Sequence, residues 1–199
     1  NNPKYLKLCD LIYISKDVST DKNNKSDLKP VIQMIKNIIK IMKKKTILII
    51  LCQVPPGFTK KIKWPLNKLY YQVETLIFGK AMRRALYPER IILGCNVLEN
   101  QINSKLKIYL ESFNCPIIKM NYESAELTKI SINLFLISSI ITSNTISEIC
   151  KKIGANWSQI NKALKMDRRI GKYAYLNPGL GIAGGNLERD LRTIIDYSN

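Results

Sequence analysis

The sequence predicts an α/β fold in which a parallel sheet is followed by an all-α region built on one long helix. Two apolar runs, 10–15 (DLIYIS) and 46–51 (TILIIL), lie on either side of an amphipathic segment. Fully apolar strands joined by a helix are typical of a parallel βαβ unit. From residue 122 onward the apolar residues follow a helical period. We therefore expect one domain at 1–121 and a second at 122–199.

Each element of the first domain has its own signal. A helix is predicted over 29–43, where apolar residues recur three and four positions apart and Pro30 lies near the first turn. The run 54–60 (VPPGFTK) ends the second strand in a proline–glycine turn, at the edge where open α/β sheets bind ligands. Further strands are predicted at 69–76, 90–94 and 116–120, and further helices at 78–86 and 104–113.

The second domain is dominated by one predicted helix at 124–152. Apolar side chains wrap nearly the whole of it, as in a helix that is central to a domain or packs against a partner subunit. Lys129 and Asn133 lie four apart on one face, and a buried ammonium or amide group needs partners. The alternative is a snorkelling lysine and a helix–helix hydrogen bond.

A glycine-rich run at 179–185 precedes the last predicted helix. Glycine allows backbone φ values closed to other residues and lets the main chain approach a ligand. Asn186 is predicted as the N-cap of that helix, whose apolar face carries Leu187, Leu191 and Ile194. The run is either a loop that delivers an anionic group to a helix N-terminus or a permissive turn. A shorter helix is predicted at 157–164, with Asn156 as its N-cap.

The chain has 32 Lys and Arg against 15 Asp and Glu in 199 residues, a formal charge of +17. Such an excess of positive charge is typical of proteins that bind nucleic acid or an anionic membrane. Most of the excess is scattered lysine, and no nucleic-acid recognition motif accompanies it. We favour compositional drift with binding of an anionic small molecule over electrostatic nucleic-acid binding. Because we find no run of 18 apolar residues and no signal-peptide pattern, we expect no membrane span.

The cysteine and histidine content indicates the cellular compartment and excludes several kinds of metal and catalytic site. Five cysteines are widely spaced without CxxC pairing, which fits a reducing, cytoplasmic compartment. The sequence contains no histidine, so a histidine zinc site, a Ser-His-Asp triad and a Cys-His dyad are excluded within it. We expect no metal.

Several segments resemble motifs of the UDP-glucose/GDP-mannose dehydrogenase family, and at 14–20 only Thr20 of the family's V-x-T-P-T segment is retained. Residues 181–190 (GIAGGNLERD) are similar to its active-site loop G-F-G-G-S-C-F-x-K-D, and 123–135 (ESAELTKISINLF) to A-E-L-x-K-x-x-x-N-x-F. Residues 167–171 (DRRIG) are similar to D-x-R-I-G, and 54–60 to the strand end S-T-V-P-x-G-T-T. The resemblance runs from about Asp10 to Asp190.

The resemblance implies a fold and a domain organisation. Residues 1–121 would be the C-terminal part of a Rossmann-like NAD-binding domain, and 122–199 a central helical domain for dimerisation and the active site. The family's G-x-G-x-x-G turn would precede Asn1, and its UDP-binding domain would follow Asn199. A homodimer through 124–152 is also implied.

The resemblance further implies roles for single residues. Glu74 matches the first glutamate of N-P-E-F-L-x-E-G, and its alternative is a surface carboxylate near Lys60 or Lys61. Arg169 matches an arginine that touches the nucleotide sugar across a dimer contact, and its alternative is an ion pair with Asp167. The implied catalytic residues are Glu74, Lys129, Asn133, Asn186 and Asp190. The implied substrate-binding residues are Arg169, Tyr175, Gly181 and Gly184, and the implied NAD-binding residues are Thr20, Gln53 and Arg189.

Asn186 stands where the family has its nucleophilic cysteine. A carboxamide cannot form the thiohemiacetal that the second oxidation of these enzymes uses. The resemblance therefore implies an NAD-dependent oxidation of the CH–OH group of a nucleotide sugar, in polysaccharide biosynthesis, without the covalent step. The alternative is a non-catalytic homologue that binds nucleotide sugar or dimerises.

Overall fold

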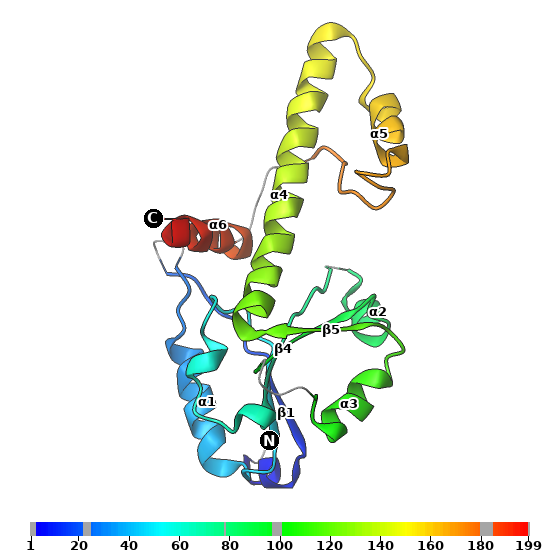
Figure 1. The fold of residues 1–199 in the computed structure, drawn as a ribbon. Helices are drawn as coiled ribbons and strands as arrows, with labels where there is room; N and C mark the ends of the chain where they lie inside the picture. The colour runs from blue at the N-terminus through cyan, green and yellow to red at the C-terminus, as the bar shows by residue number, and fades with distance from the viewer. Residues whose placement is uncertain (1–2, 22–24, 78, 97–100, 180–184, 199) are drawn as a thin grey trace. The chain divides into compact units, whose positions relative to one another are not determined.

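The computed structural model describes residues 3–21, 25–77, 79–96, 101–179 and 185–198. Within them, five strands form one mixed sheet in the order β1-β2-β3-β4-β5 (Figure 1). The strands are β1 (Leu11–Ile14), β2 (Ile47–Ile50), β3 (Leu69–Gln72), β4 (Ile91–Cys95) and β5 (Ile117–Asn121). The described helices confirm that a helical part follows the sheet.

The predicted parallel βαβ unit is confirmed. β1 and β2 run parallel, with Leu11 opposite Ile47, and α1 (Lys29–Ile41) connects them. All four residues of β2 are buried because both faces of the sheet are covered. A strand in that environment has no solvent-facing side and therefore reads as a continuous apolar run.

β4 departs from the expected parallel arrangement. β3 is parallel to β2, but β4 runs antiparallel to β3, with Gln72 opposite Leu93. Residues of the connection 73–90 and residues at the carboxyl edge of the first three strands line the same cavity. The connection therefore stays at that edge, and β4 starts from it. A parallel strand would have required a crossover to the opposite edge.

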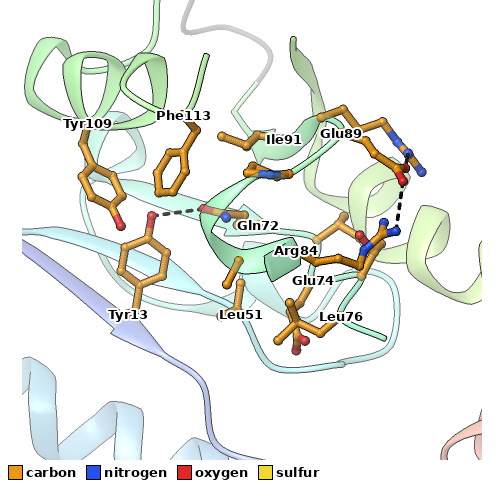
Figure 2. A pocket seen from close by; sticks show the side chains of 15 residues that line it. Tyr13, Leu51, Gln72, Glu74, Leu76, Arg84, Glu89, Ile91, Tyr109 and Phe113 are labelled. Carbon is orange, nitrogen blue, oxygen red and sulfur yellow. Dashed lines mark hydrogen bonds and ion pairs between the residues drawn. The ribbon is translucent and has the colours of Figure 1, made fainter. Parts of the chain in front are cut away.

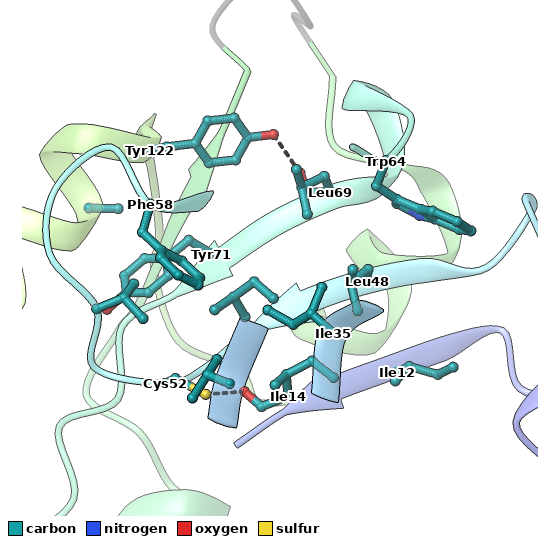
Figure 3. Packing of buried hydrophobic residues seen from close by; sticks show 14 of the residues in the cluster. Ile12, Ile14, Ile35, Leu48, Cys52, Phe58, Trp64, Leu69, Tyr71 and Tyr122 are labelled. Atoms are coloured by element: carbon teal, nitrogen blue, oxygen red, sulfur yellow. Dashed lines mark hydrogen bonds between the residues drawn. The ribbon is translucent and has the colours of Figure 1, made fainter. Parts of the chain in front are cut away.

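Two apolar clusters cover the two faces of the sheet. On one face, Ile35 of α1 packs with Leu48, as part of the cluster drawn in Figure 3. On the other face, Leu106 of α3 (Ser104–Glu111) packs with Ile49. Adjacent residues of β2 thus point to opposite faces, which is the period-two alternation of a strand.

The long helix α4 (Tyr122–Ile153) begins directly on the sheet. The Tyr122 hydroxyl donates a hydrogen bond to the Leu69 carbonyl oxygen at 2.8 Å. A Cβ atom at Gly94 of β4 would lie 2.8 Å from the Cβ of Ala125. Only glycine permits this close approach, so a side chain at position 94 would push α4 off the sheet.

The other helical elements are η1 (Pro3–Leu8), η2 (Thr59–Lys61), η3 (Leu66–Lys68), α2 (Ala81–Leu86), α5 (Trp157–Met166) and α6 (Gly185–Ser198). Most predicted boundaries hold within two residues, the usual scatter of element ends. The prediction for β3 was too long by four residues, because residues 73–76 leave the sheet and line the cavity. α2 starts at Ala81 rather than 78.

The chain divides into two compact units, Asn1–Lys129 and Ile130–Asn199. This division lies inside α4, whereas the predicted domain boundary at 121/122 lies at its start. In the second unit, Asn156 caps α5 as predicted, because its Oδ1 accepts a hydrogen bond from the Ser158 N–H at 2.9 Å. α6 begins at Gly185, one residue before Asn186, and the predicted N-cap side chain of Asn186 lies outside the described residues.

Much of the apolar surface of α4 is exposed. Phe135 is 78% exposed and Ile141 52%, whereas Ile130 and Ile137 are buried. Among the described residues, α4 is the one helix that is long and apolar enough to cross a membrane by length and composition, and the expectation of no membrane span stays a prediction. Core helices of soluble proteins have the same length and composition, so these properties alone do not indicate a membrane span.

Candidate active site

A cavity of about 300 Å³ lies at the carboxyl edge of β1, β2 and β3 (Figure 2). Tyr13 and Tyr109 line one side of it, where their ring centroids are 6.2 Å apart. The Tyr13 hydroxyl donates a hydrogen bond to Gln72 Oε1 at 3.1 Å. Burial raises the pKa of Tyr13, so the hydroxyl stays protonated and remains a donor.

Glu74 lines the same cavity, two residues after β3 ends. Figure 2 shows its side chain beside Arg84, whose guanidinium pairs with Glu89 at 3.0 Å. Lys60, named above as an alternative partner of Glu74, pairs with Glu123 instead, also at 3.0 Å. Glu74 is half-buried among the residues that line this cavity.

The turn after β2 reveals a residue that the sequence analysis assigned no role. Glu126, on α4, is completely buried. Its Oε1 accepts a hydrogen bond from the Thr59 N–H at 2.8 Å, and its Oε2 accepts one from the Gly57 N–H at 2.5 Å. Burial raises the pKa of Glu126, and the hydrogen bonds from Thr59 and Gly57 oppose that rise. Two sequence signals could have found it: Glu126 is the glutamate of the A-E-L-x-K-x-x-x-N-x-F match, and a carboxylate among apolar helix residues needs a specific partner when it is buried.

In the second unit, Asn133 and Asp190 are brought together. The Asn133 Nδ2 donates to Asp190 Oδ2 at 2.5 Å, and the two residues are 9% and 1% exposed. The buried Arg189 guanidinium lies 3.9 Å from Asp190 Oδ1, so an opposite charge also faces this carboxylate. Two residues that are 57 positions apart thus form one buried polar site between α4 and α6.

Lys129 lies one helical turn before Asn133 on α4, and its side chain is half-buried. Residues four apart on a helix are neighbours on the same face, so the ammonium group belongs to the side of α4 that carries Asn133. Two of the candidate catalytic residues, Lys129 and Asn133, thus share one face of α4.

Other predicted site residues lie elsewhere or outside the described residues. The Arg169 side chain is 89% exposed, and its Nη2 pairs with Asp167 Oδ2 at 2.6 Å, which is the ion pair named as its alternative role. Tyr175 is 58% exposed. Thr20 forms a bridge with Ser26, and Gln53 is half-buried just after β2, so both belong to the first unit, whereas Arg189 belongs to the second. Gly181, Gly184 and the side chain of Asn186 lie outside the described residues.

Residues 179–184 (GLGIAG) also match the spacing G-x-G-x-x-G of dinucleotide-binding turns. That motif is informative only between a strand and a helix. A helix follows it here, but the described residues before it, 171–179, form no strand. We therefore assign no dinucleotide-binding turn to this run.

Two family profiles match the chain. The NAD binding domain of the UDP-glucose/GDP-mannose dehydrogenase family matches residues 1–113, and the central domain of that family matches 123–199. The chain belongs to the UDP-glucose/GDP-mannose dehydrogenase family. The first unit is thus part of the family's NAD-binding domain, and the cofactor is NAD.

Curated relatives agree with this assignment, and a solved structure has the same fold. The chain is 29% identical over 192 residues to UDP-glucose 6-dehydrogenase of Rickettsia conorii, covering 94% of this chain and 44% of the relative. It is 34% identical over 167 residues to UDP-glucose 6-dehydrogenase of Campylobacter jejuni, covering 81% and 42%. A UDP-glucose dehydrogenase of Pyrobaculum islandicum has the same fold, with a TM-score of 0.81 at 21% identity, over 99% of this chain and 48% of that structure. The chain thus spans less than half of these dehydrogenases.

Proposed function

We propose that this chain is part of an enzyme that oxidises an alcohol carbon of a nucleotide sugar with NAD. The observation that carries the proposal is the buried Asn133–Asp190 hydrogen bond, with Lys129 one turn away on α4. A buried carboxylate held by an amide and close to a guanidinium combines a proton acceptor with hydrogen-bond donors, the groups that catalytic sites use. The family membership supplies the reaction class.

The residues of the first unit fit part of a bound dinucleotide. Open α/β sheets bind cofactors at the carboxyl ends of their parallel strands, where this chain has the 300 Å³ cavity with aromatic and polar walls. We propose that Thr20, Gln53 and Arg189 contact NAD. NAD, when bound, accepts the hydride that leaves the sugar carbon.

The protons and charges are handled by residues of this chain. Asp190 accepts the hydroxyl proton, directly or through a water molecule, while the C–H electron pair leaves as hydride and a carbonyl group forms. Lys129 stabilises the negative charge on the sugar oxygen by its positive charge. Asn133 Nδ2 carries two protons, and since Asp190 accepts one of them, the other can bond to the same sugar oxygen. Glu74 positions a water molecule.

Binding of the sugar nucleotide is assigned to the exposed part of the second unit. We propose that Arg169, Tyr175, Gly181 and Gly184 contact the substrate. The Arg169 guanidinium donates two hydrogen bonds to the Asp167 carboxylate, at 2.6 and 3.0 Å. That bidentate pair orients the guanidinium, and a diphosphate would compete with the carboxylate for it.

The reaction ends at the carbonyl stage, because Asn186 offers no nucleophile for a covalent adduct. We expect wild-type full-length protein to form one NADH for each nucleotide sugar consumed, measured as absorbance of NADH against loss of substrate. Formation of two NADH with an acid product would contradict the proposal.

A second candidate function is a non-catalytic nucleotide-sugar-binding homologue. It is favoured by the replacements at the family's motif positions, namely Asn186 for cysteine, Phe78 for the second glutamate and Gln53 for a threonine. The same assay separates the two functions. Binding of nucleotide sugar without any NADH formation would establish this second candidate.

We further propose that the exposed apolar face of α4 is covered by a second copy of the chain. Phe135, at 78% exposure, has the largest apolar surface to bury there. Phe135→Asp is expected to shift the full-length protein from dimer to monomer, because an unpaired charge would be buried in the interface. The matched control is Ile108→Asp on α3, where the wild-type side chain is 71% exposed.

Sedimentation at several protein concentrations measures the outcome of that experiment. A Phe135→Asp protein that remains dimeric would contradict the use of this face.

The cytoplasm is the proposed compartment, since the five cysteines, Cys9, Cys52, Cys95, Cys115 and Cys150, are all free thiols.

A further inference from the structure

Glu126 joins the first turns of α4 to the turn that follows β2. Its two carboxylate oxygens accept separate hydrogen bonds from the N–H groups of Gly57 and Thr59. A carboxylate without solvent contact is costly to bury unless its oxygens are hydrogen-bonded. These two bonds therefore compensate the burial, and they tie the turn to α4 at two points.

The arrangement requires both oxygens of a carboxylate. A glutamine at this position would offer one carbonyl oxygen and one NH2 group. The NH2 group would face a backbone N–H, so one of the two hydrogen bonds would be lost and a donor would be left without a partner. An aspartate would keep the charge but is shorter by one methylene group and would not reach both N–H groups.

The backbone conformation of the turn is also restricted by contacts within the turn. Gly57 adopts φ of 83°, in the left-handed region that favours glycine. The Phe58 N–H donates to the Pro55 carbonyl oxygen at 3.2 Å, which closes the turn. Gln53 stands immediately before Val54 and Pro55, so the position of the turn sets where Gln53 emerges from the end of β2.

A second contact between the same two elements provides a natural comparison. Lys60, just after the turn, pairs with Glu123 of α4 at 3.0 Å. That pair is solvent-exposed, with 69% and 39% of the two side chains accessible. Exposed ion pairs contribute little to the position of the elements they join. The buried Glu126 contact and the exposed Glu123 contact thus connect the same segments with very different expected strength.

We infer that Glu126 is a positioning residue for the cofactor edge, which fixes the 53–59 turn against α4 in the geometry that binds NAD. Glu126 does not touch the cofactor or the reacting atoms. It acts through the backbone of Gly57 and Thr59, and so links the edge that carries Gln53 to the helix that carries Lys129 three residues further on. The inference rests on the proposed function, because it concerns the same NAD-binding edge.

The test compares Glu126→Gln with Glu123→Gln in the full-length protein. Titration with NAD is followed by intrinsic fluorescence, and nucleotide-sugar binding is measured separately on the same samples. Glu126→Gln is expected to raise the Kd for NAD about tenfold, the effect of losing roughly one charge-assisted hydrogen bond. The Kd for the nucleotide sugar is expected to stay unchanged, and Glu123→Gln is expected to leave both constants unchanged.

The outcomes separate the inference from the proposed function. A wild-type protein that does not bind NAD refutes the proposed function. If the wild type binds NAD and a folded Glu126→Gln variant binds it with unchanged affinity, the inference alone is overturned. The same holds if Glu123→Gln loses as much NAD affinity as Glu126→Gln. A loss of both NAD and sugar affinity would indicate general damage and would also overturn it. If Glu126→Gln does not fold, Glu126→Asp replaces it with the same expected loss of NAD affinity.

Discussion

Replacement of Lys129 by methionine in the full-length protein is expected to lower kcat about 100- to 1,000-fold, the usual cost of removing one group that stabilises a developing oxyanion. Methionine keeps the length and apolar stem of the side chain, so packing around α4 changes little. The positive charge that opposes the negative charge on the sugar oxygen is lost. Because this charge develops during the reaction, kcat should fall while the Kd for NAD stays the same.

The matched control is Lys151→Met on the same helix. Lys151 is 71% exposed and pairs with Glu148 at 2.7 Å in an i,i+3 surface contact. Such pairs contribute little, so the control should keep wild-type kcat and stability. Initial rates at saturating NAD and substrate, with NAD titrations on the same preparations, measure the effect. A Lys129→Met protein that retains more than about a tenth of wild-type kcat would remove Lys129 from the catalytic residues.

Asn186→Cys is expected to convert a one-step oxidation into a two-step one. Asn186 is the second residue of α6, where the free N–H groups and dipole of the helix N-terminus lower the pKa of a thiol. The thiolate can add to the carbonyl product and form a thiohemiacetal, which gives up a second hydride to NAD and leaves a thioester for hydrolysis. The yield should rise from one NADH per nucleotide sugar to two, and the product should become the acid.

Asn186→Ala is the control for that experiment, because it removes the amide without adding a nucleophile. It should still stop at one NADH per nucleotide sugar. Coupled measurement of NADH and of the acid product by mass spectrometry reports the result. If Asn186→Cys binds NAD normally, turns over and nevertheless stays at one NADH, the residue at position 186 does not decide how far the oxidation proceeds.

Local patterns in the sequence determined the elements and the family. The spacing of apolar residues indicates which faces of an element are buried. It does so in β1 and β2, which are continuous apolar runs, and in α1, where apolar residues follow a helical period. The motifs around Lys129, Asn133 and Asp190 were sufficient for the resemblance, because they keep both residue type and spacing.

The tertiary structure alone decided three further features. β4 runs antiparallel because residues 73–90 stay at one edge of the sheet, and no spacing in the sequence states that path. Asn133 meets Asp190 across 57 residues, and Glu126 meets Gly57 across 69. Hydrogen bonds of this kind have no periodicity, since their partners are selected by where the folded chain returns, and buried polar groups must then find a partner there.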